Sequence, residues 1–200
     1  MMMFFTADLH FGDNETIERE SRPFADISEF EETIVANVNK VASSEDILYV
    51  LGDWINYNRI NHPDLETCQK TFEISKRMNP KVILILGNNE ERIVRDRYDG
   101  DFQKMRSDLI SRGFEDVLKK EEDIEINEEP IHLIHCPVDR KEGVINLFGH
   151  THRWTGLWKP FGLNVGTDLN FFRPFSEKDI IYLLEHKREW CDKDENCSCM

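Results

Sequence analysis

The strongest constraint on the fold of this chain is a set of five short apolar runs. Each run is followed by residues that can bind metal ions. The runs open the stretches MFFTADLH, DILYVLGDW, VILILGNN, IHLIHCP and INLFGHTH. The polar residues at or just after their ends are Asp8, His10, Asp53, Asn88, His135, His150 and His152. Short apolar runs bounded by turn residues are typical of buried strands. Because ligands bind beyond the carboxyl ends of strands in open α/β sheets, we expect these side chains to form one site.

The segments between these runs indicate helices. Apolar residues recur at helical spacing in 28–42, where Ser28 can cap the helix, in 64–78, and in 101–112 before Gly113. The polar stretch 12–24 is predicted to be a long loop. The predicted strands are 3–7, 47–51, 82–86, 123–127, 131–135, 145–148, 161–165 and 179–184. Strands that alternate with helices and then follow one another directly favour an α/β layered domain.

The chain of 200 residues fits one domain with a sizeable core. No repeat or Pro/Gly/Ser-rich linker divides it, and we predict a single domain over 1–186. Residues 187–200 are hydrophilic and contain cysteines, which predicts a flexible tail.

Composition argues against several kinds of partner. The formal net charge is −14, so the surface should repel nucleic-acid polymers, and a phosphate substrate would need a local cation from metal or arginine. No run approaches the ~18 apolar residues of a membrane span. The start, MMMFF, lacks a basic leader, and the five cysteines do not form a secreted disulfide framework. These features predict a cytoplasmic protein with free thiols that does not bind membranes.

Each strand-end group alone has an ordinary explanation. Asp53 and Asn88 follow glycines in what are turns by default, and His135 in an apolar run is more often a core histidine. The two histidines behind Gly149 are a stronger signal. Taken together, nitrogen and oxygen ligands without cysteine suit a borderline divalent metal and argue against a structural zinc. Seven groups exceed one tetrahedral ion and suit two ions that share a carboxylate.

The order D-x-H, GD, GN, a lone H and GHTH resembles the calcineurin-like metallophosphoesterases, from Asp8 to His152. The resemblance implies an α/β fold, a four-layer α-β-β-α sandwich of two mixed sheets flanked by helices. It implies that one ion is held by Asp8, His10 and His152, and the other by Asn88, His135 and His150. Asp53 would bridge the two divalent ions, for which manganese is expected, with iron, zinc or nickel as alternatives.

The same resemblance implies hydrolysis of a small phosphodiester or nucleotide-like phosphate ester by a hydroxide between the ions. Asp53, Asn89 and His150 are then the expected catalytic residues. The family commonly has a histidine in place of Asn89, which protonates the leaving group. An amide can donate a hydrogen bond to a phosphate oxygen but cannot transfer a proton at neutral pH. We therefore expect acidic leaving groups, or another acid, for which the candidates are His62 and Asp13. His132, near His135 on the same predicted strand, is expected to support the metal ligands.

The role of Arg22 and the class of function each have an alternative interpretation. Arg22, before Pro23, is expected to bind the substrate phosphate together with Asn89, with an ordinary surface arginine as the alternative. The alternatives to an enzyme for small phosphate esters are a non-catalytic metal-binding scaffold and a nuclease. The sequence predicts no oligomeric state.

Overall fold

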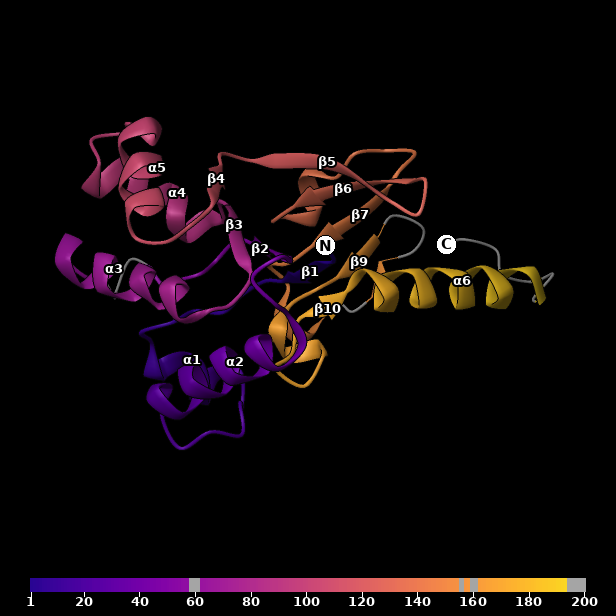
Figure 1. Ribbon diagram of the computed structural model, residues 1–200, viewed down its shortest axis with the longest axis horizontal. Coiled ribbons are helices and arrows are strands. Elements are labelled where there is room, and N and C mark those ends of the chain that lie inside the picture. The colour runs from indigo at the N-terminus through magenta and orange to yellow at the C-terminus, as the bar shows by residue number, and fades with distance from the viewer. Residues whose placement is uncertain (58–61, 155–156, 159–161, 194–200) are drawn as a thin grey trace.

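The first of two mixed sheets carries most of the parallel strands. The computed structural model describes residues 1–57, 62–154, 157–158 and 162–193 (Figure 1). The sheet has the order β10-β1-β2-β3-β4, in which β1 to β4 are parallel and β10 is antiparallel to β1. Its strands are Met3–Thr6 (β1), Ile47–Leu51 (β2), Lys81–Ile85 (β3), Asp116–Leu118 (β4) and Phe175–Ser176 (β10).

The second sheet has the order β5-β6-β7-β9-β8. Its central strands β6, β7 and β9 are parallel, and β5 and β8 pair antiparallel at the two edges. These strands are Glu121–Ile126 (β5), Glu129–Ile134 (β6), Ile145–Phe148 (β7), Leu157–Trp158 (β8) and Gly162–Asn164 (β9). The two mixed sheets expected from the sequence are confirmed.

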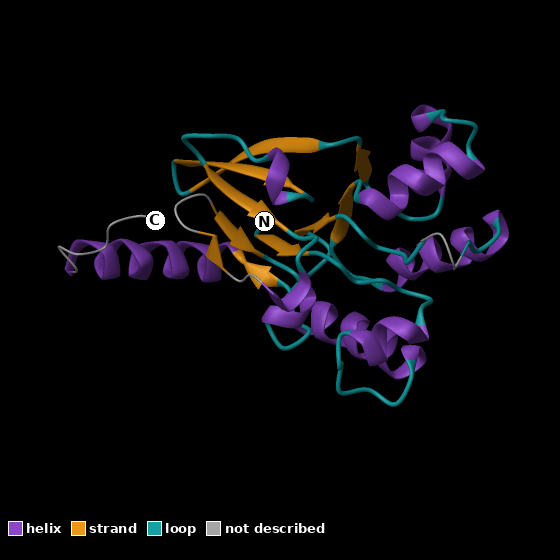
Figure 2. Cartoon of the chain, turned by 180° about the vertical axis from the view of Figure 1, so that it is seen from behind, coloured by secondary structure: helices purple, strands orange, loops and turns teal. Residues whose placement is uncertain are grey.

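Five helices pack on the outer face of the first sheet (Figure 2). They are Asn14–Arg19 (α1), Ile27–Val41 (α2), Leu65–Phe72 (α3), Asn88–Arg97 (α4) and Phe102–Ser111 (α5). A 3-10 helix, Glu73–Arg77 (η1), continues α3. The last helix, Glu177–Lys193 (α6), places Ile180 in the core between the sheets and then extends away from the strands (Figure 1).

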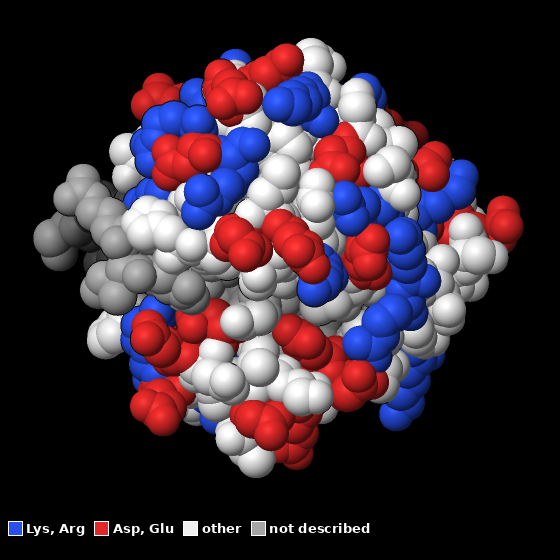
Figure 3. All heavy atoms as spheres, turned by 90° about the vertical axis from the view of Figure 1, so that its left-hand side faces the viewer, with Lys and Arg blue, Asp and Glu red and all other residues white. Residues whose placement is uncertain are grey.

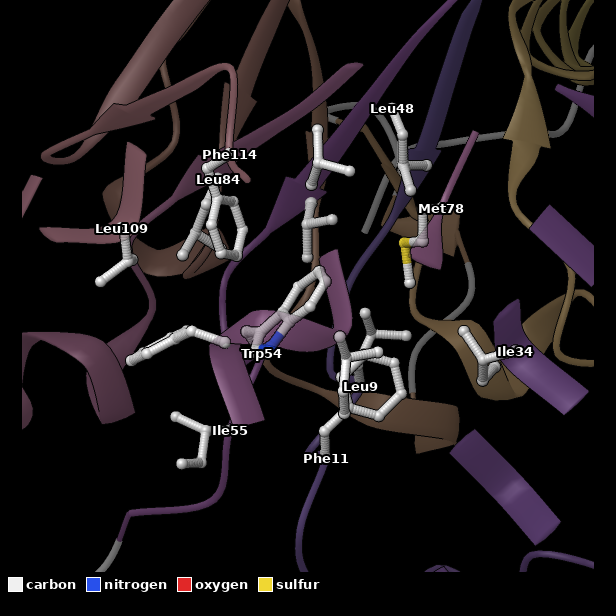
Figure 4. Close-up of a cluster of buried hydrophobic side chains, with 14 of the residues drawn as sticks. Leu9, Phe11, Ile34, Leu48, Trp54, Ile55, Met78, Leu84, Leu109 and Phe114 are labelled. Atoms are coloured by element: carbon white, nitrogen blue, oxygen red, sulfur yellow. The ribbon is translucent and has the colours of Figure 1, made fainter. Parts of the chain in front are cut away.

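Side chains that point to alternate faces of the first sheet belong to two hydrophobic cores. In β2, Leu48 and Val50 point to the helices, while Tyr49 and Leu51 point to the second sheet. Because successive strand residues face opposite sides, both faces of the first sheet are buried, which explains its almost uninterrupted apolar runs. Figure 4 shows the core on the helical side, where Trp54 lies between Phe11 and Phe114.

The outer face of the second sheet is covered thinly. The 3-10 helix Pro137–Asp139 (η2) and the loop after it lie over this face, where Lys141 N–H donates to Asn146 Oδ1 at 2.9 Å and Lys141 Nζ to Asp123 at 2.6 Å. The fourth layer of the sandwich is therefore one short turn of helix and a loop. None of the described helices combines the length and apolar composition that crossing a bilayer requires.

Three secondary-structure predictions are wrong. The stretch 12–24 is not all loop, because Asp13 caps α1 by accepting from the N–H groups of Glu15 and Thr16. The turn predicted at Gly87 and Asn88 is instead the start of α4, with Gly87 as its N-cap residue. The segment 179–184 is helical, since its apolar run DIIYLL suits both structures and the strand positions of this edge are taken by β10.

Two smaller predictions also change. The helix at 28–42 is capped by Asp26, whose Oδ1 accepts from Glu29 N at 2.9 Å, and not by Ser28. Residues 187–193 of the predicted tail belong to α6, so the predicted boundary at 186 is not an element boundary. Residues 194–200 lie outside the described residues, and the division into domain and tail stays a prediction.

Candidate metal centre

The carboxyl ends of β1, β2, β3, β6 and β7 meet, as the sequence predicts. The loops after β1 and β2 run side by side, with Asp8 N–H donating to Gly52 O at 3.1 Å and His10 N–H to Asp53 O at 2.9 Å. Hydrogen bonds also join the two sheets at this point. His150 N–H donates to Asp8 Oδ1 at 2.9 Å, and His135 Nδ1 lies 2.8 Å from Leu51 O.

One group of candidate ligands is Asp8, His10 and His152, which each bring a ligand atom within 4.8 Å of the other two. The rings of His10 and His152 stack with their centroids 4.9 Å apart. Asp8 Oδ2, both ring nitrogens of His10 and Nδ1 of His152 are buried without a hydrogen-bond partner. Buried polar atoms normally have hydrogen-bond partners, so a cation bound by these nitrogens and this oxygen would account for their lack of one.

A second group brings together Asn88, His135 and His150. Asn88 Oδ1 lies 3.1 Å from His135 Nε2 and 2.9 Å from His150 Nδ1, and the two imidazole nitrogens are 3.1 Å apart. The contact with Leu51 O assigns the proton of His135 to Nδ1, which leaves Nε2 free as a ligand. Three possible ligand atoms, one oxygen and two nitrogens, therefore converge at distances that fit a second cation.

Asp53 lies between the two groups. Its Oδ2 is 3.7 Å from His10 Nε2 in the first group, and its Oδ1 is 3.6 Å from His135 Nε2 in the second. One carboxylate that presents an oxygen to each group is the geometry of a bridging ligand.

Five of these side chains sit on left-handed backbone. The φ angles are 58° at Asp8, 52° at His10, 55° at Asp53, 70° at His150 and 47° at His152. Non-glycine residues adopt this conformation at a cost of about 1–3 kcal/mol each, and such residues cluster at functional sites. Here the sharp turns let ligands one or two residues apart point to the same place.

Two glycines admit the close approach of the loops. A Cβ on Gly87 would lie 2.3 Å from Asp53 Oδ1, and one on Gly52, whose φ is +83°, would lie 2.4 Å from His135 Nδ1. Only glycine fits at either position while the ligands keep their places.

A family model of the calcineurin-like phosphoesterases matches residues 1–195 of the chain. The chain belongs to this family. An uncharacterized protein of Methanocaldococcus jannaschii is 29% identical over 90 residues, or 44% of this chain and 47% of that protein. The match thus spans about half the length of this curated relative.

Two solved structures resemble this chain. A protein of unknown function from Aquifex aeolicus has a TM-score of 0.64 at 24% identity, over 91% of this chain and 98% of that one, so the fold is shared. An archaeal phosphodiesterase has a TM-score of 0.45 at 17% identity, over 83% of this chain and 82% of that one.

In this calcineurin-like centre, Glu90 holds the loop that carries Asp53. The carboxylate is fully buried and accepts from Asp53 N and Gly87 N at 2.9 Å each and from Ile55 N at 3.3 Å. Burial, together with the nearby charge of Asp53, raises the pKa of Glu90 to about 7. Its role, which sequence alone did not reveal, is to tie the ends of β2 and β3 together.

Asn89 lines the cleft over the two groups. Its Oδ1 accepts from Tyr57 N at 3.1 Å, and its backbone N–H donates to Asp53 Oδ1 at 3.1 Å. The amide is therefore oriented with Nδ2 as the remaining donor, and no acceptor for it lies among the described residues. This is compatible with the expected contact to a phosphate oxygen.

Arg22 does not have the place that either sequence interpretation gave it. Its side chain is 0% exposed, and it is not among the residues that line the cleft. The guanidinium donates to Leu9 O at 2.9 Å, to Asp8 O at 2.7 Å and, through two nitrogens, to Asp168. Arg22 thus fixes the backbone that carries Asp8 and His10, and the geometry gives it no contact with a substrate.

The two candidate acids, Asp13 and His62, and the expected supporting residue His132 have other contacts. Asp13 is a helix cap, His132 bonds Asp123 at 2.7 Å on the outer side of β6, and His62 is exposed beside Tyr57. None of the three lines the cleft among the described residues. None of the three therefore lies where it could replace the histidine that the family commonly has in place of Asn89.

The cleft itself has a volume of about 580 Å³ and contains residues that sequence patterns did not indicate. Besides the ligand candidates and Asn89, it is lined by Arg19, Glu20, Asn56, Arg92, Thr151 and Trp154. Trp154 is 82% exposed at its edge. These residues come from loops and helix ends without a motif, so only their common position identifies them.

On the face at which α3, α4 and α5 lie, acidic and basic side chains are interspersed (Figure 3), so the net charge does not make this face uniformly negative.

Metal binding should weaken in acid. Burial raises the pKa of Asp8 to about 6. Burial lowers the pKa values of His135 and His152, but nearby carboxylates outweigh it and raise both above 6.5. A metal ion binds the unprotonated forms, so it competes with protons at these three ligands below neutral pH. From about pH 7.5 to about pH 5.5, we expect Mn²⁺ affinity to fall by about 100-fold.

Titration calorimetry in two buffers of different ionisation enthalpy measures this effect, because the difference in heat counts the protons released. Proton release that is absent at about pH 6 would contradict the expectation.

Proposed function

We propose that this protein is a phosphoesterase with two divalent ions that hydrolyses a small phosphodiester or nucleotide-like phosphate ester. The observation that carries the proposal is Asp53, which presents one oxygen to His10 of the first group of candidate ligands and the other to His135 of the second. Asp8, His10 and His152 would hold one ion, and Asn88, His135 and His150 the other. When bound, the ions would supply Lewis-acid stabilisation of phosphoryl charge and activation of water.

The protein's own residues would orient the substrate. Asn89 Nδ2 would donate to a phosphoryl oxygen, held in that direction by the bond between its Oδ1 and Tyr57 N. Glu90 and Arg22 would hold the ligand loops in the geometry that binds metal, so that little rearrangement is needed when substrate enters. Manganese is our first expectation for the ions, because histidine, carboxylate and amide ligands accept it, and iron, zinc and nickel are alternatives.

The test is hydrolysis of bis-p-nitrophenyl phosphate and p-nitrophenyl phosphate with and without Mn²⁺. Both esters have activated leaving groups, so neither requires a proton donor in place of Asn89. Metal-dependent turnover would support the proposal, and the ratio of the two rates would narrow the ester class. A protein that binds two ions and hydrolyses neither ester with any of the four metals would point to the scaffold alternative.

Replacing Asn89 by histidine should extend the substrate range. The introduced imidazole can still accept from Tyr57 N through one nitrogen while the other faces the cleft. General acid catalysis is worth about 10²–10⁴-fold, so Asn89→His should raise kcat/KM for alkyl phosphoesters by about 100-fold. Nitrophenyl esters serve as the internal control, because their rates should change little. Equal rates of Asn89→His and wild type on every alkyl ester would contradict this role.

A further inference from the structure

The wall of the cleft formed by α4 carries an arginine without an acidic partner. Arg92 follows Asn88 and Asn89 by one turn of α4, so the three side chains share a face of the helix. Its Nη1 donates to Tyr57 O at 3.3 Å, and no carboxylate among the described residues pairs with it.

The other arginine that lines the cleft, Arg19, differs from Arg92. Arg19 lies near His10, but its Nε donates to Glu20 Oε1 at 3.0 Å and its Nη2 to Thr16 Oγ1 at 3.0 Å. The charge of Arg19 is thus already matched by a carboxylate. Among the described residues of the cleft, uncompensated positive charge lies only on the α4 wall, beside Asn88 and His150.

The side chains by which α4 lines the cleft include no imidazole or carboxyl group. Asn88, Asn89 and Arg92 present two amides and a guanidinium, which can donate hydrogen bonds but are not general acids. A guanidinium does bind two oxygens of a phosphate at once through its parallel N–H groups. This wall can therefore hold an anion that leaves, but it cannot protonate an alkoxide.

We propose that Arg92 binds a second phosphate of the substrate, attached directly to the one that is attacked, so that the bond cleaved is a phosphoanhydride. This inference rests on the proposed function and names its substrate class as a nucleotide-like diphosphate. Arg92 lies about 6 Å along the helix from Asn88, which is within reach of a group bonded to the phosphoryl centre. A leaving phosphate needs no proton, because its second pKa is about 6.

The reaction balances with water alone. The water oxygen forms a bond to the attacked phosphorus, and the bond from this phosphorus to the bridging oxygen breaks. The bridging oxygen keeps the electron pair and departs as part of the second phosphate, which Arg92 neutralises. The protons of the water pass to the phosphate products and to solvent.

The first test measures binding, without turnover. Full-length protein loaded with Mn²⁺ is titrated with methylenediphosphonate and with methylphosphonate, for wild type, Arg92→Gln, Arg92→Lys and Arg95→Gln. Arg95 lies on the same helix, pairs with Asp96 at 2.6 Å and does not line the cleft, so it is a matched control. We expect wild type and Arg95→Gln to bind the diphosphonate about 10- to 100-fold tighter than the monophosphonate.

Arg92→Gln should lose about 10-fold or more of this preference, and Arg92→Lys should lose part of it, because lysine keeps the charge without the paired N–H groups. Methylenediphosphonate also chelates Mn²⁺, so the preference of each variant is compared with wild type. A preference that Arg92→Gln retains in full would overturn the proposal.

The second test compares hydrolysis of ADP, AMP and bis-p-nitrophenyl phosphate. We expect kcat/KM to be highest for ADP, with release of phosphate, and to fall by about 10- to 100-fold in Arg92→Gln. Cleavage of the nitrophenyl diester without cleavage of ADP would overturn the role of Arg92 while the proposed function stands. Failure on all three by a protein that binds two ions would overturn both.

Discussion

Asp53→Ala is expected to abolish hydrolysis and to release metal from both groups of ligands. Asp53 presents an oxygen to each group, at 3.7 Å from His10 Nε2 and 3.6 Å from His135 Nε2. Without it, two cations would lie close together with no carboxylate between them, and neither would keep a full set of ligands. Metal ions supply several kcal/mol of transition-state stabilisation, so the rate should fall by at least about 1,000-fold.

Metal content by mass spectrometry, together with turnover of bis-p-nitrophenyl phosphate, measures this effect. His152→Ala is the matched control, because it removes a ligand from the first group only. It should lower the content from two ions to one, whereas Asp53→Ala should leave none after dialysis. Two ions retained by Asp53→Ala would show that the carboxylate does not bridge them.

The candidate ligands could be predicted from the sequence because each follows an apolar run that is a strand. β2 occupies 47–51, as expected, and Asp53 comes two residues after its end. Parallel neighbours in a sheet end at the same edge, so order along the chain becomes proximity in space. The same logic placed His135 and His150 after β6 and β7.

Short helices with little apolar content could not be predicted in the same way. α1 buries Thr16 and Ile17, and α4 buries Ile93 as its single large apolar residue, so neither shows a helical hydrophobic period. Both are instead specified by their ends. Asp13 caps α1, and Glu90 bonds the backbone at the start of α4.

Contacts between residues that are far apart in the sequence could not be predicted either. Arg22 and Asp168 are separated by 146 residues, and no local pattern shows that the two meet. Arg92 is likewise an ordinary helical arginine until the fold places it at the cleft, where it donates to Tyr57 O and meets no carboxylate among the described residues. The residues that would contact a substrate could therefore be identified only from the tertiary structure, whereas the candidate metal ligands could be identified from the ends of the predicted strands.

Arg22→Gln should destabilise the metal-free protein and weaken the first metal site together. The guanidinium is buried, pairs with Asp168 at 2.8 Å and stacks over Phe30 with 4.5 Å between Cζ and the ring centroid. Removing one partner of a buried ion pair leaves the other charge uncompensated, at a cost of about 3–5 kcal/mol. Arg106→Gln is the control, because its pair with Asp116 is partly exposed and should be worth about 1 kcal/mol or less.

The double variant Arg22→Met/Asp168→Leu separates stability from positioning. It removes both charges, so it should recover much of the unfolding free energy that Arg22→Gln loses in urea. It should not recover Mn²⁺ affinity, because the carbonyl oxygens of Asp8 and Leu9 remain without their donor and the left-handed turn at Asp8 and His10 loses its support. Recovery of both properties would mean that the ion pair stabilises the fold and that the turn holds its ligands without Arg22.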